Sequence, residues 1–325
     1  MSSLVLKNEL LRWLLGGEPW VVYRTLSGLL GYDESHADVA AARQAVSKHR
    51  LIKPILGRQH RRGYWGRPED IHTWWPRKDT TFWIIGVLAD FGLTLENPHM
   101  ARSAEYVLDL QLPLGGFLGF EPQKAAECHT AILLEPLVKS SLGDDTRIHR
   151  AYQWLLSRQR LDGGWWCKDT GQIGAPREKE PSCPFATMFV LSAMDQRPEL
   201  RKHSASQRAV DFLLSCWDNK GKLKYPGHDS QIGTGWEKLK YPFTDYRILK
   251  FLDVLSRFPA ARRDPRTQEI LNLLKAKSDE QACFQPESIV NVWGDFDFGQ
   301  KKEPSRWLTM LVWRVMRRFG KQEWL

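Results

Sequence analysis

Polar and aromatic side chains recur at the starts of the apolar segments of this 325-residue chain. If each apolar segment is a helix, its first turn carries unpaired backbone N–H groups and the positive end of the helix dipole. Together these bind anions such as a diphosphate. Asp, Ser and Thr at the same positions also cap helices, so capping is the alternative interpretation at each position. The residues are Trp20, Tyr23, Arg24, Lys78, Asp79, Thr80, Glu127, Cys128, His129, Ser182, Cys183, Thr244, Asp245, Arg247, Ser305, Arg306 and Trp307.

Two groups of candidates follow from this pattern. Titratable side chains could transfer protons if burial shifts their pKa values, and aromatic side chains could line a pocket for an apolar substrate. The candidate catalytic residues are Asp79, His129, Asp245 and Arg306. The candidate substrate-binding residues are Trp20, Tyr23, Arg24, Trp75, Trp83, Phe185, Tyr246 and Trp307.

The elements that must position these residues alternate in character. Strongly apolar stretches such as TTFWIIGVLADF alternate with stretches that are apolar along one face only. Buried helices are apolar all round, whereas outer helices are apolar along a stripe. About six such pairs predict an all-α (α/α)6 toroid with inner helices around a cavity, as one domain over residues 1–325. The expected helices span residues 4–15, 19–30, 36–58, 79–91, 97–111, 127–142, 145–159, 183–194, 204–216, 243–258, 265–277 and 304–319.

A glutamine followed by a glycine and an aromatic residue recurs at intervals of roughly 50 to 60 residues. The copies are Gln59/Gly63/Trp65, Gln111/Gly115/Phe117 and Gln159/Gly163/Trp165. They match the QW motif, so the chain resembles the terpenoid cyclase and protein prenyltransferase superfamily, which implies an α-toroid. The aromatic residues of these turns are expected to tie repeats together. Through residues 18–25, 238–243 and 297–305 the chain is also similar to a group of bacterial and archaeal prenyltransferase-repeat proteins, which brings no activity to carry over.

The resemblance implies one cofactor, because protein prenyltransferases hold zinc with one Asp, one Cys and one His. His129, Cys183 and Asp245 lie near the starts of three successive predicted inner helices and could converge on such an ion. Zinc accepts this ligand set, and three protein ligands leave a position open for chemistry. The Asp-x-Cys spacing of that family is absent, however, and a His or Cys on an apolar helix can equally be a packed core residue.

The resemblance also suggests proton-initiated cyclisation. Class II cyclases of the superfamily protonate an alkene with the middle Asp of an Asp-x-Asp-Asp motif, which this chain lacks. Asp79, Asp245 or Asp297 could supply the proton instead if burial raised its pKa. Aromatic faces near the inner helix starts could then stabilise a carbocation.

The composition limits the partners that we expect. The formal net charge of +9 favours anionic partners: phosphates, diphosphates, anionic lipid or nucleic acid. No apolar run is long enough to span a membrane, and the N-terminus has no secretory signal. Five cysteines without a C-x-x-C pair fit a reducing compartment, so a cytoplasmic protein is expected.

The sequence thus predicts an isoprenoid-processing protein that holds a small apolar or anionic substrate in its central cavity. The alternative is a non-enzymatic or nucleic-acid-binding toroid that works through its basic surface, since the run RRGYW mixes basic and aromatic residues as single-strand binders do. An anionic membrane surface is a further candidate partner. A buried Asp or His in the pocket would favour the first reading, and a continuous basic stripe the second.

Overall fold

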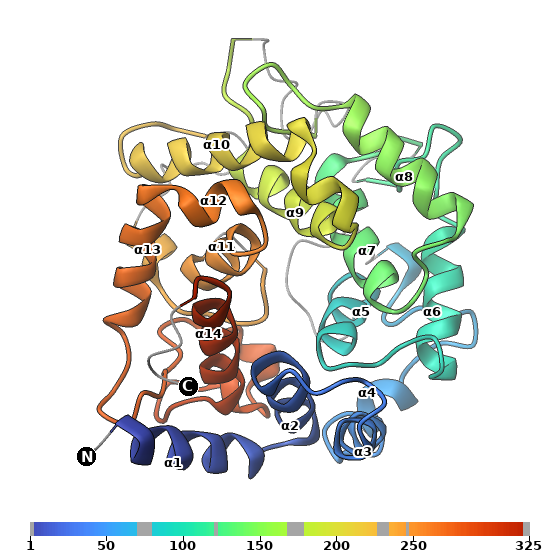
Figure 1. The fold of residues 1–325 in the computed structure, drawn as a ribbon. Coiled ribbons are helices and arrows are strands. Elements are labelled where there is room, and N and C mark those ends of the chain that lie inside the picture. The colour runs from blue at the N-terminus through green and yellow to red at the C-terminus, as the bar shows by residue number, and fades with distance from the viewer. Residues whose placement is uncertain are drawn as a thin grey trace.

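The computed structural model describes residues 3–69, 80–119, 123–167, 179–225, 234–244 and 247–320, with the side chains of residues 3–6 left aside. Over these residues the helices form two concentric rings, the (α/α)6 toroid that the alternation predicts (Figure 1). The inner ring consists of α2 (Pro19–Arg24) with its continuation η1 (Thr25–Leu30), α5 (Thr81–Asp90), α7 (Glu127–Lys139), α9 (Pro184–Asp195), α11 (Ile248–Leu255) and α14 (Arg306–Arg318). The outer helices are α1 (Ser3–Leu15), α3 (Ala37–Val46), α4 (Lys53–Gly57), α6 (Pro98–Leu108), α8 (Thr146–Ser157), α10 (Ser204–Asp218), α12 (Pro259–Arg263) and α13 (Pro265–Lys275).

The inner helices pack against one another around the ring. Helix α5 contacts α7, α7 contacts α9, α9 contacts α11, α11 contacts α14, and α14 contacts α2. Helix α1 packs on α14, so the N-terminal helix supplies the outer partner of the last inner helix. This closure brings the two ends of the helical part of the chain together (Figure 1).

Burial separates the two rings as the apolar patterns predict. Every residue of α9 is buried. In α8, by contrast, the buried residues Ile148, Ala151, Tyr152, Trp154 and Leu155 form a stripe along one side. A helix enclosed by neighbours on all sides has no solvent face to fill with polar residues, which explains the difference.

Two predicted helices differ from the structure. The expected helix over residues 36–58 is two helices, because α3 ends at Val46 and α4 starts afresh at Lys53, with Pro54 in its first turn. Proline fits the first turn of a helix but breaks a helix interior. The expected helix over residues 243–258 begins only at Ile248.

Each of the three Gln–Gly–aromatic turns is bonded to the next outer helix. The side-chain amide of Gln59 donates to the carbonyl of Gly63 in its own turn (3.1 Å) and to that of His99 in α6 (2.7 Å). The equivalent bonds run from Gln111 to Gly115 and Arg147, and from Gln159 to Gly163 and Ala205. Each glutamine oxygen also accepts from an arginine of that next helix: Arg102, Arg150 or Arg208.

A threonine of the following inner helix fixes the aromatic residue that closes each turn. The backbone N–H of Trp65 donates to Thr81 Oγ1 at 2.8 Å. The same bond joins Phe117 to Thr130 and Trp165 to Thr187. Phe284, in the loop after α13 and outside these three turns, makes the equivalent bond to Thr309 of α14. The indole N–H groups of Trp65 and Trp165 reach back to the carbonyls of Ile55 and Leu155 in the preceding outer helices. These side chains therefore connect an outer helix to the next inner helix.

Candidate functional site

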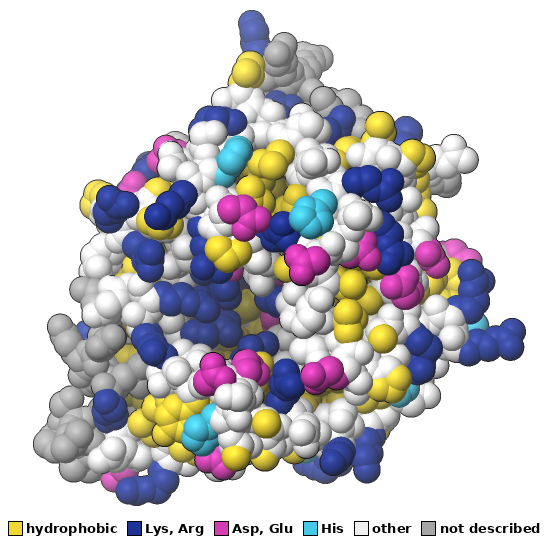
Figure 2. Space-filling view, turned by 45° about the vertical axis from the view of Figure 1, so that its right-hand side comes forward, with side chains coloured by type: hydrophobic (Ala, Val, Ile, Leu, Met, Phe, Trp, Pro, Cys, Tyr) yellow, Lys and Arg dark blue, Asp and Glu magenta, His cyan; other side chains and the backbone are white. Residues whose placement is uncertain are grey.

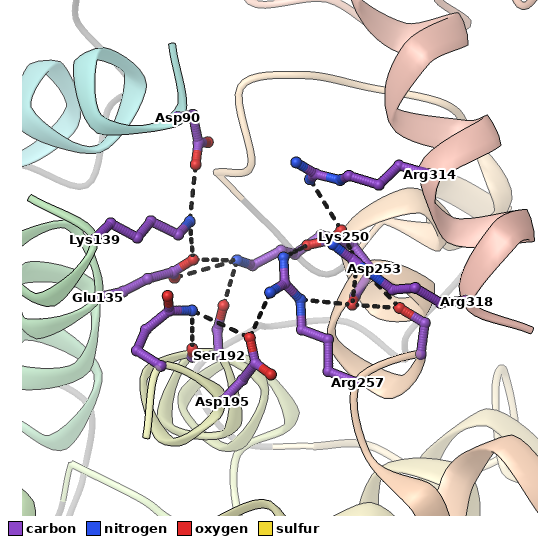
Figure 3. A network of polar contacts seen from close by, with 12 residues as sticks. Asp90, Glu135, Lys139, Ser192, Asp195, Lys250, Asp253, Arg257, Arg314 and Arg318 are labelled. Carbon is purple, nitrogen blue, oxygen red and sulfur yellow. Dashed lines mark hydrogen bonds and ion pairs between the residues drawn. The ribbon is translucent and has the colours of Figure 1, made fainter. Parts of the chain in front are cut away.

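A network of charged side chains lies at the C-terminal ends of the inner helices, whereas most of the residues that the sequence singled out come from the first turns of these helices. Asp90 ends α5, Lys139 ends α7 and Asp195 ends α9. Side chains from α11 and α14 complete the network, and all of them point toward the centre of the ring (Figure 3).

Glu135 and Lys250 form the most buried ion pair on one side of this network. Lys250 Nζ lies 3.3 Å from Glu135 Oε2 and donates to Ser192 Oγ at 2.7 Å. Lys139 Nζ joins Glu135 Oε1 (2.6 Å) to Asp90 Oδ1 (2.8 Å). Burial alone would raise the pKa of Glu135, but the charges of Lys139 and Lys250 hold this pKa far below its usual range. Glu135 is therefore ionised at neutral pH.

On the other side, three guanidinium groups converge on Asp253. Arg318 Nη1 lies 2.8 Å and Arg314 Nη2 lies 3.1 Å from the same oxygen, Oδ1. Arg257 Nη2 contacts Oδ2 at 3.3 Å, and its Nη1 contacts Asp195 Oδ2 at 2.5 Å. Burial opposes the charge of Asp253, but the three arginines lower its pKa well below the ordinary value. Burial, with the neighbouring guanidinium of Arg257, lowers the pKa of Arg318 in turn.

Arginine collects at this end because helix C-termini expose carbonyl groups. Arg24 donates from Nε to the carbonyl of Asp90 (2.7 Å) and from Nη2 to that of Ala89 (3.0 Å), at the end of α5. Arg317 Nη1 donates to the carbonyls of Gly28 and Leu29, near the end of η1. Cations are stabilised at the negative end of the helix dipole. Some of the arginines at this end of the ring therefore serve to cap helix C-termini.

A cavity opens beside the network. It is lined by Phe82, Trp83, Gly86, Val87, Asp90, Ile132, Glu135, Pro136, Lys139, Phe189, Tyr241, Pro242, Phe243 and Lys250, and its volume is about 50 Å³. This is room for roughly four water molecules. Tyr241 donates its hydroxyl to Asp90 Oδ2 at 3.1 Å, and burial raises its pKa well above the ordinary value. Figure 2 shows Lys and Arg side chains gathered at a hollow near the middle of one face of the molecule.

Lys250 also occupies the aromatic part of this cavity. Its ammonium lies 5.2 Å from the centre of the Phe189 ring and 5.1 Å from that of Phe243. Aromatic faces attract cations at such distances. A protein cation therefore already takes up the position in which these two rings could stabilise a positive charge.

Of the aromatic residues selected from the sequence, Trp83 lines this cavity. Trp20 and Trp307 are buried against Phe91, the residue that follows α5, at ring-centre distances of 4.6 and 5.1 Å. Phe185 is buried against Phe189, at 4.7 Å. None of these three side chains lines the described cavity, but Trp307 lies 5.5 Å from the Tyr241 ring and Phe185 packs on Phe189, and both Tyr241 and Phe189 are in the lining.

Two further candidates lie away from the ring centre. Tyr23 donates its hydroxyl to Glu34 Oε1 at 2.9 Å, before α3. Arg306 donates to the carbonyl of Trp13 at 3.0 Å, and its guanidinium lies over the Trp13 ring, between α14 and α1. Arg24, the remaining cation of the set, belongs to the C-terminal network. Asp79, Trp75, Asp245 and Tyr246 lie outside the described residues.

His129 and Cys183 are both buried near the starts of inner helices. The buried His129 ring lies 4.9 Å from that of Phe82. Cys183 precedes α9, and its N–H donates to the carbonyl of Trp165 at 2.9 Å. Burial raises the pKa of Cys183 to about 12, so its thiol stays protonated at neutral pH. Among the residues that the structure describes, no group of three His, Cys, Asp or Glu is arranged to hold a metal ion, and Asp245 is outside them.

Asp297 is a half-buried residue whose carboxyl group lies at the N-terminal end of α14. Its Oδ2 accepts from Ser305 Oγ at 2.9 Å and from the backbone N–H of Trp307 at 3.1 Å. Its Oδ1 is buried without a partner among the described residues. Burial, with a contribution from the charge of Glu18, raises the pKa of Asp297. The carboxyl group therefore caps the first turn of α14.

Residues 69–260 match the model of the squalene-hopene cyclase C-terminal domain family, which is more than half of the chain. The chain belongs to this family. The squalene-hopene cyclase of Bradyrhizobium diazoefficiens is 28% identical over 150 residues, or 45% of this chain and 22% of that protein. The chain thus spans about a fifth of the length of this curated relative.

Solved structures resemble this squalene-hopene cyclase family member over most of its length. A protein from Actinoplanes has a TM-score of 0.48 at 14% identity, covering 98% of this chain and 99% of that one. The type II terpene cyclase MstE from Scytonema in complex with geranylgeranyl dihydroxybenzoate has a TM-score of 0.46 at 12% identity, with 93% and 87% covered. None of the described helices is long and apolar enough to cross a membrane.

The sequence pattern missed most of the network of this cyclase-family protein. Glu135, Asp195, Lys250 and Asp253 are charged residues inside or at the end of otherwise apolar inner helices. Such residues are almost never fully buried unless they are paired. A charged residue within a helix that is otherwise apolar on all sides was therefore the sequence feature that could have predicted this network at the centre of the ring.

Proposed function

We propose that this family member binds the apolar end of an isoprenoid-type molecule in the central cavity. Membership of the squalene-hopene cyclase C-terminal domain family supports an apolar terpenoid ligand in general. The observation that carries the proposal for this chain is the glycine at position 86, in the middle of the inner helix α5.

Gly86 keeps the cavity open. It lies inside α5, where glycine is about 1 kcal/mol less favourable than alanine. It lines the cavity, and a Cβ atom there would meet no heavy atom within 4 Å. A Cβ atom would therefore fit without a clash, and side-chain atoms beyond it would extend into the space. A residue that weakens its helix and leaves a hollow is explained if the hollow receives a ligand.

The rest of the lining suits an apolar group of limited size. Phe82, Trp83, Phe189, Tyr241 and Phe243 supply aromatic walls. A volume of about 50 Å³ is far below that of an ordinary ligand pocket, so it admits only the tip of an apolar chain and not a folded triterpene. Because Lys250 already lies against Phe189 and Phe243, we propose binding of the chain and leave cyclisation aside.

The test is binding of geranylgeraniol, a neutral prenyl alcohol, followed by quenching of tryptophan fluorescence. Trp83 lines the cavity and should respond. Gly86→Leu should fill the cavity and abolish binding, while leucine in place of glycine should make α5 more stable by about 1 kcal/mol. A folded Gly86→Leu protein that binds the alcohol as well as the unaltered protein would refute the proposal.

Gly57→Leu is the matched control. Gly57 is also helical, in α4, and a Cβ there also meets nothing within 4 Å, but it faces solvent. This substitution adds the same side chain away from the cavity and should leave binding unchanged. Loss of binding in both variants would indicate an indirect effect and would count against the cavity.

A further inference from the structure

Two guanidinium groups of α14 share one carboxylate oxygen at the end of the inner ring. Arg314 and Arg318 are one helical turn apart, and both contact Asp253 Oδ1, at 3.1 and 2.8 Å. A single carboxylate charge is divided between them, and Arg257 draws on the same carboxylate through Oδ2. The positive charge around Asp253 is therefore only partly compensated.

Donors remain on this pair of arginines. A guanidinium has five N–H donors, and Arg314 uses Nη2 for Asp253 while its Nε is buried without a partner in the described part of the chain. Arg318 donates through Nη1 to Asp253 and Ser256. The side chains are 15% and 24% exposed, so a ligand can reach them. The donors that an added anion can meet are the remaining N–H groups of the two partly exposed guanidinium groups.

The other cations at this end are already engaged. Arg24 caps the carbonyls at the end of α5, and Arg317 caps those near the end of η1. Arg257 is held by Asp195 and by Asp253. The negative ends of these helices would repel an anion, but the capping guanidinium groups compensate them. Arg314 and Arg318 are left to bind a further negative charge.

The position of this pair connects it to the cavity. In Figure 3 Arg314 points into the central space that Asp90 and Lys139 also face. Asp90 and Lys139 line the cavity, and the charge of Arg314 acts on Tyr241 in the same lining. A molecule whose apolar end lies between the aromatic rings could therefore place a polar head at Arg314 and Arg318.

We propose that Arg314 and Arg318 bind a phosphate or diphosphate group. Two adjacent planar guanidinium groups offer parallel N–H donors that match the oxygens of such a group. Binding of a phosphate group by this pair is independent of the function proposed above. Only the further statement, that this group is the head of the molecule in the cavity, rests on that function.

The experiment is a calorimetric titration of the full chain with inorganic diphosphate at fixed ionic strength. Arg314→Gln and Arg318→Gln should each weaken binding by about tenfold, because each removes charge-assisted hydrogen bonds. Arg262→Gln removes an exposed arginine of α12 and should leave binding unchanged. No binding by the unaltered protein, or equal binding by all variants, overturns the proposal.

A second variant and a second ligand keep the result interpretable. If a glutamine variant fails to fold, Arg318→Lys retains the charge but not the planar donor pair and should still bind more weakly. Geranylgeraniol tests the cavity alone. Binding of diphosphate without binding of the alcohol would refute the proposed function and leave the anion site standing, and the reverse result would refute the anion site.

Geranylgeranyl diphosphate distinguishes the two sources of a phosphate group. Tighter binding than inorganic diphosphate, lost in Gly86→Leu, identifies the head of a prenyl lipid as the ligand. Equal affinities identify a free phosphate compound. In both cases Arg314→Gln should bind the ligand more weakly than the unaltered protein does. Unchanged affinity in Arg314→Gln would contradict the proposed anion site.

Discussion

The carbonyl oxygen of Arg208 lies 2.6 Å from the position that a Cβ atom on Gly163 would occupy. Real Cβ atoms do not approach backbone this closely, and the carbonyl belongs to α10, which cannot move without disturbing the ring. Gly163 also has a φ of 89°, in the left-handed region. The close approach explains why this turn requires glycine.

We therefore expect Gly163→Ala to be far more destabilising than a left-handed backbone alone would make it. Gly221→Ala is the control, because Gly221 has a φ of 76° and a Cβ there meets nothing within 4 Å. The backbone effect should lower the free energy of unfolding by about 1 kcal/mol in both variants. The clash should add several kcal/mol at position 163 only. Chemical denaturation measures both; equal losses would contradict the packing described here.

Thr187 joins a turn to an inner helix through one hydroxyl. Its Oγ1 accepts from the N–H of Trp165 at 3.0 Å and donates to the carbonyl of Cys183 at 2.8 Å. Thr187→Val keeps the shape but leaves the buried N–H of Trp165 unpaired, which should lower the free energy of unfolding by about 1–3 kcal/mol. Thr187→Ser keeps the hydroxyl and should lose less. Urea denaturation of both variants tests the bond, and a larger loss in the serine variant would exclude it.

The sequence predicted these turns better than it predicted the site. Gln159, Gly163 and Trp165 lie within one short stretch, so their spacing alone indicated the turn. Thr187 lies 22 positions after Trp165, and nothing local reveals their bond. Lys250 and Glu135 are 115 positions apart. Such distant residues can be paired only when the positions of the helices around the ring are known. The pattern of apolar segments predicts the order of the helices but not which side chains meet.

The helix ends also explain why the sequence did not point to this network. Caps and dipoles predicted anions at the N-termini, where Ser305 and Asp297 do cap α14. The same dipole stabilises cations at C-termini, and Arg24 is used in that way at the end of α5. The long arginine side chain reaches a neighbouring helix, so its place in the sequence does not reveal which helix end it caps.

Asp253 should be indispensable for stability. Asp253→Asn removes the charge that holds Arg257, Arg314 and Arg318, which should lower the free energy of unfolding by about 3–5 kcal/mol. The folded pKa of Asp253 lies below the unfolded value near 3.8. Its stabilisation is thus complete above that pH and is lost as the pH falls through the folded pKa. The variant should therefore differ most from the unaltered protein near neutral pH.

Thermal denaturation from pH 3 to pH 8 checks this dependence. Asp144→Asn, in which an exposed aspartate is replaced, should remain within about 0.5 kcal/mol of the unaltered protein. A loss in Asp253→Asn no greater than in Asp144→Asn would show that the three arginines do not depend on this carboxylate.

Buried thiols should resist alkylation at pH 8. Burial raises the pKa values of Cys167, Cys183 and Cys216, so each stays protonated, and the thiolate is the form that reacts. Iodoacetamide followed by peptide mass spectrometry should label none of them in the folded protein and all three after denaturation. Because a metal-bound thiolate is also protected, zinc is measured on the same sample. Rapid labelling of Cys183 in the folded state would contradict its burial.

Asp297 should show the opposite pH dependence to Asp253. Its folded pKa is raised above the unfolded value near 3.8, so the proton is bound more tightly in the folded state. The associated stability is fully present below the unfolded pKa and is lost as the pH rises through the folded pKa. Asp297→Asn cannot ionise and can still accept from Ser305 and Trp307 through its amide oxygen. We therefore expect this variant to gain stability relative to the unaltered protein as the pH rises from 4 to 8. Asp211→Asn, at a position where the side chain is 78% exposed, should show no such trend. A relative loss for Asp297→Asn across the same range would mean that the carboxylate is better stabilised by its N–H and O–H donors than its burial suggests.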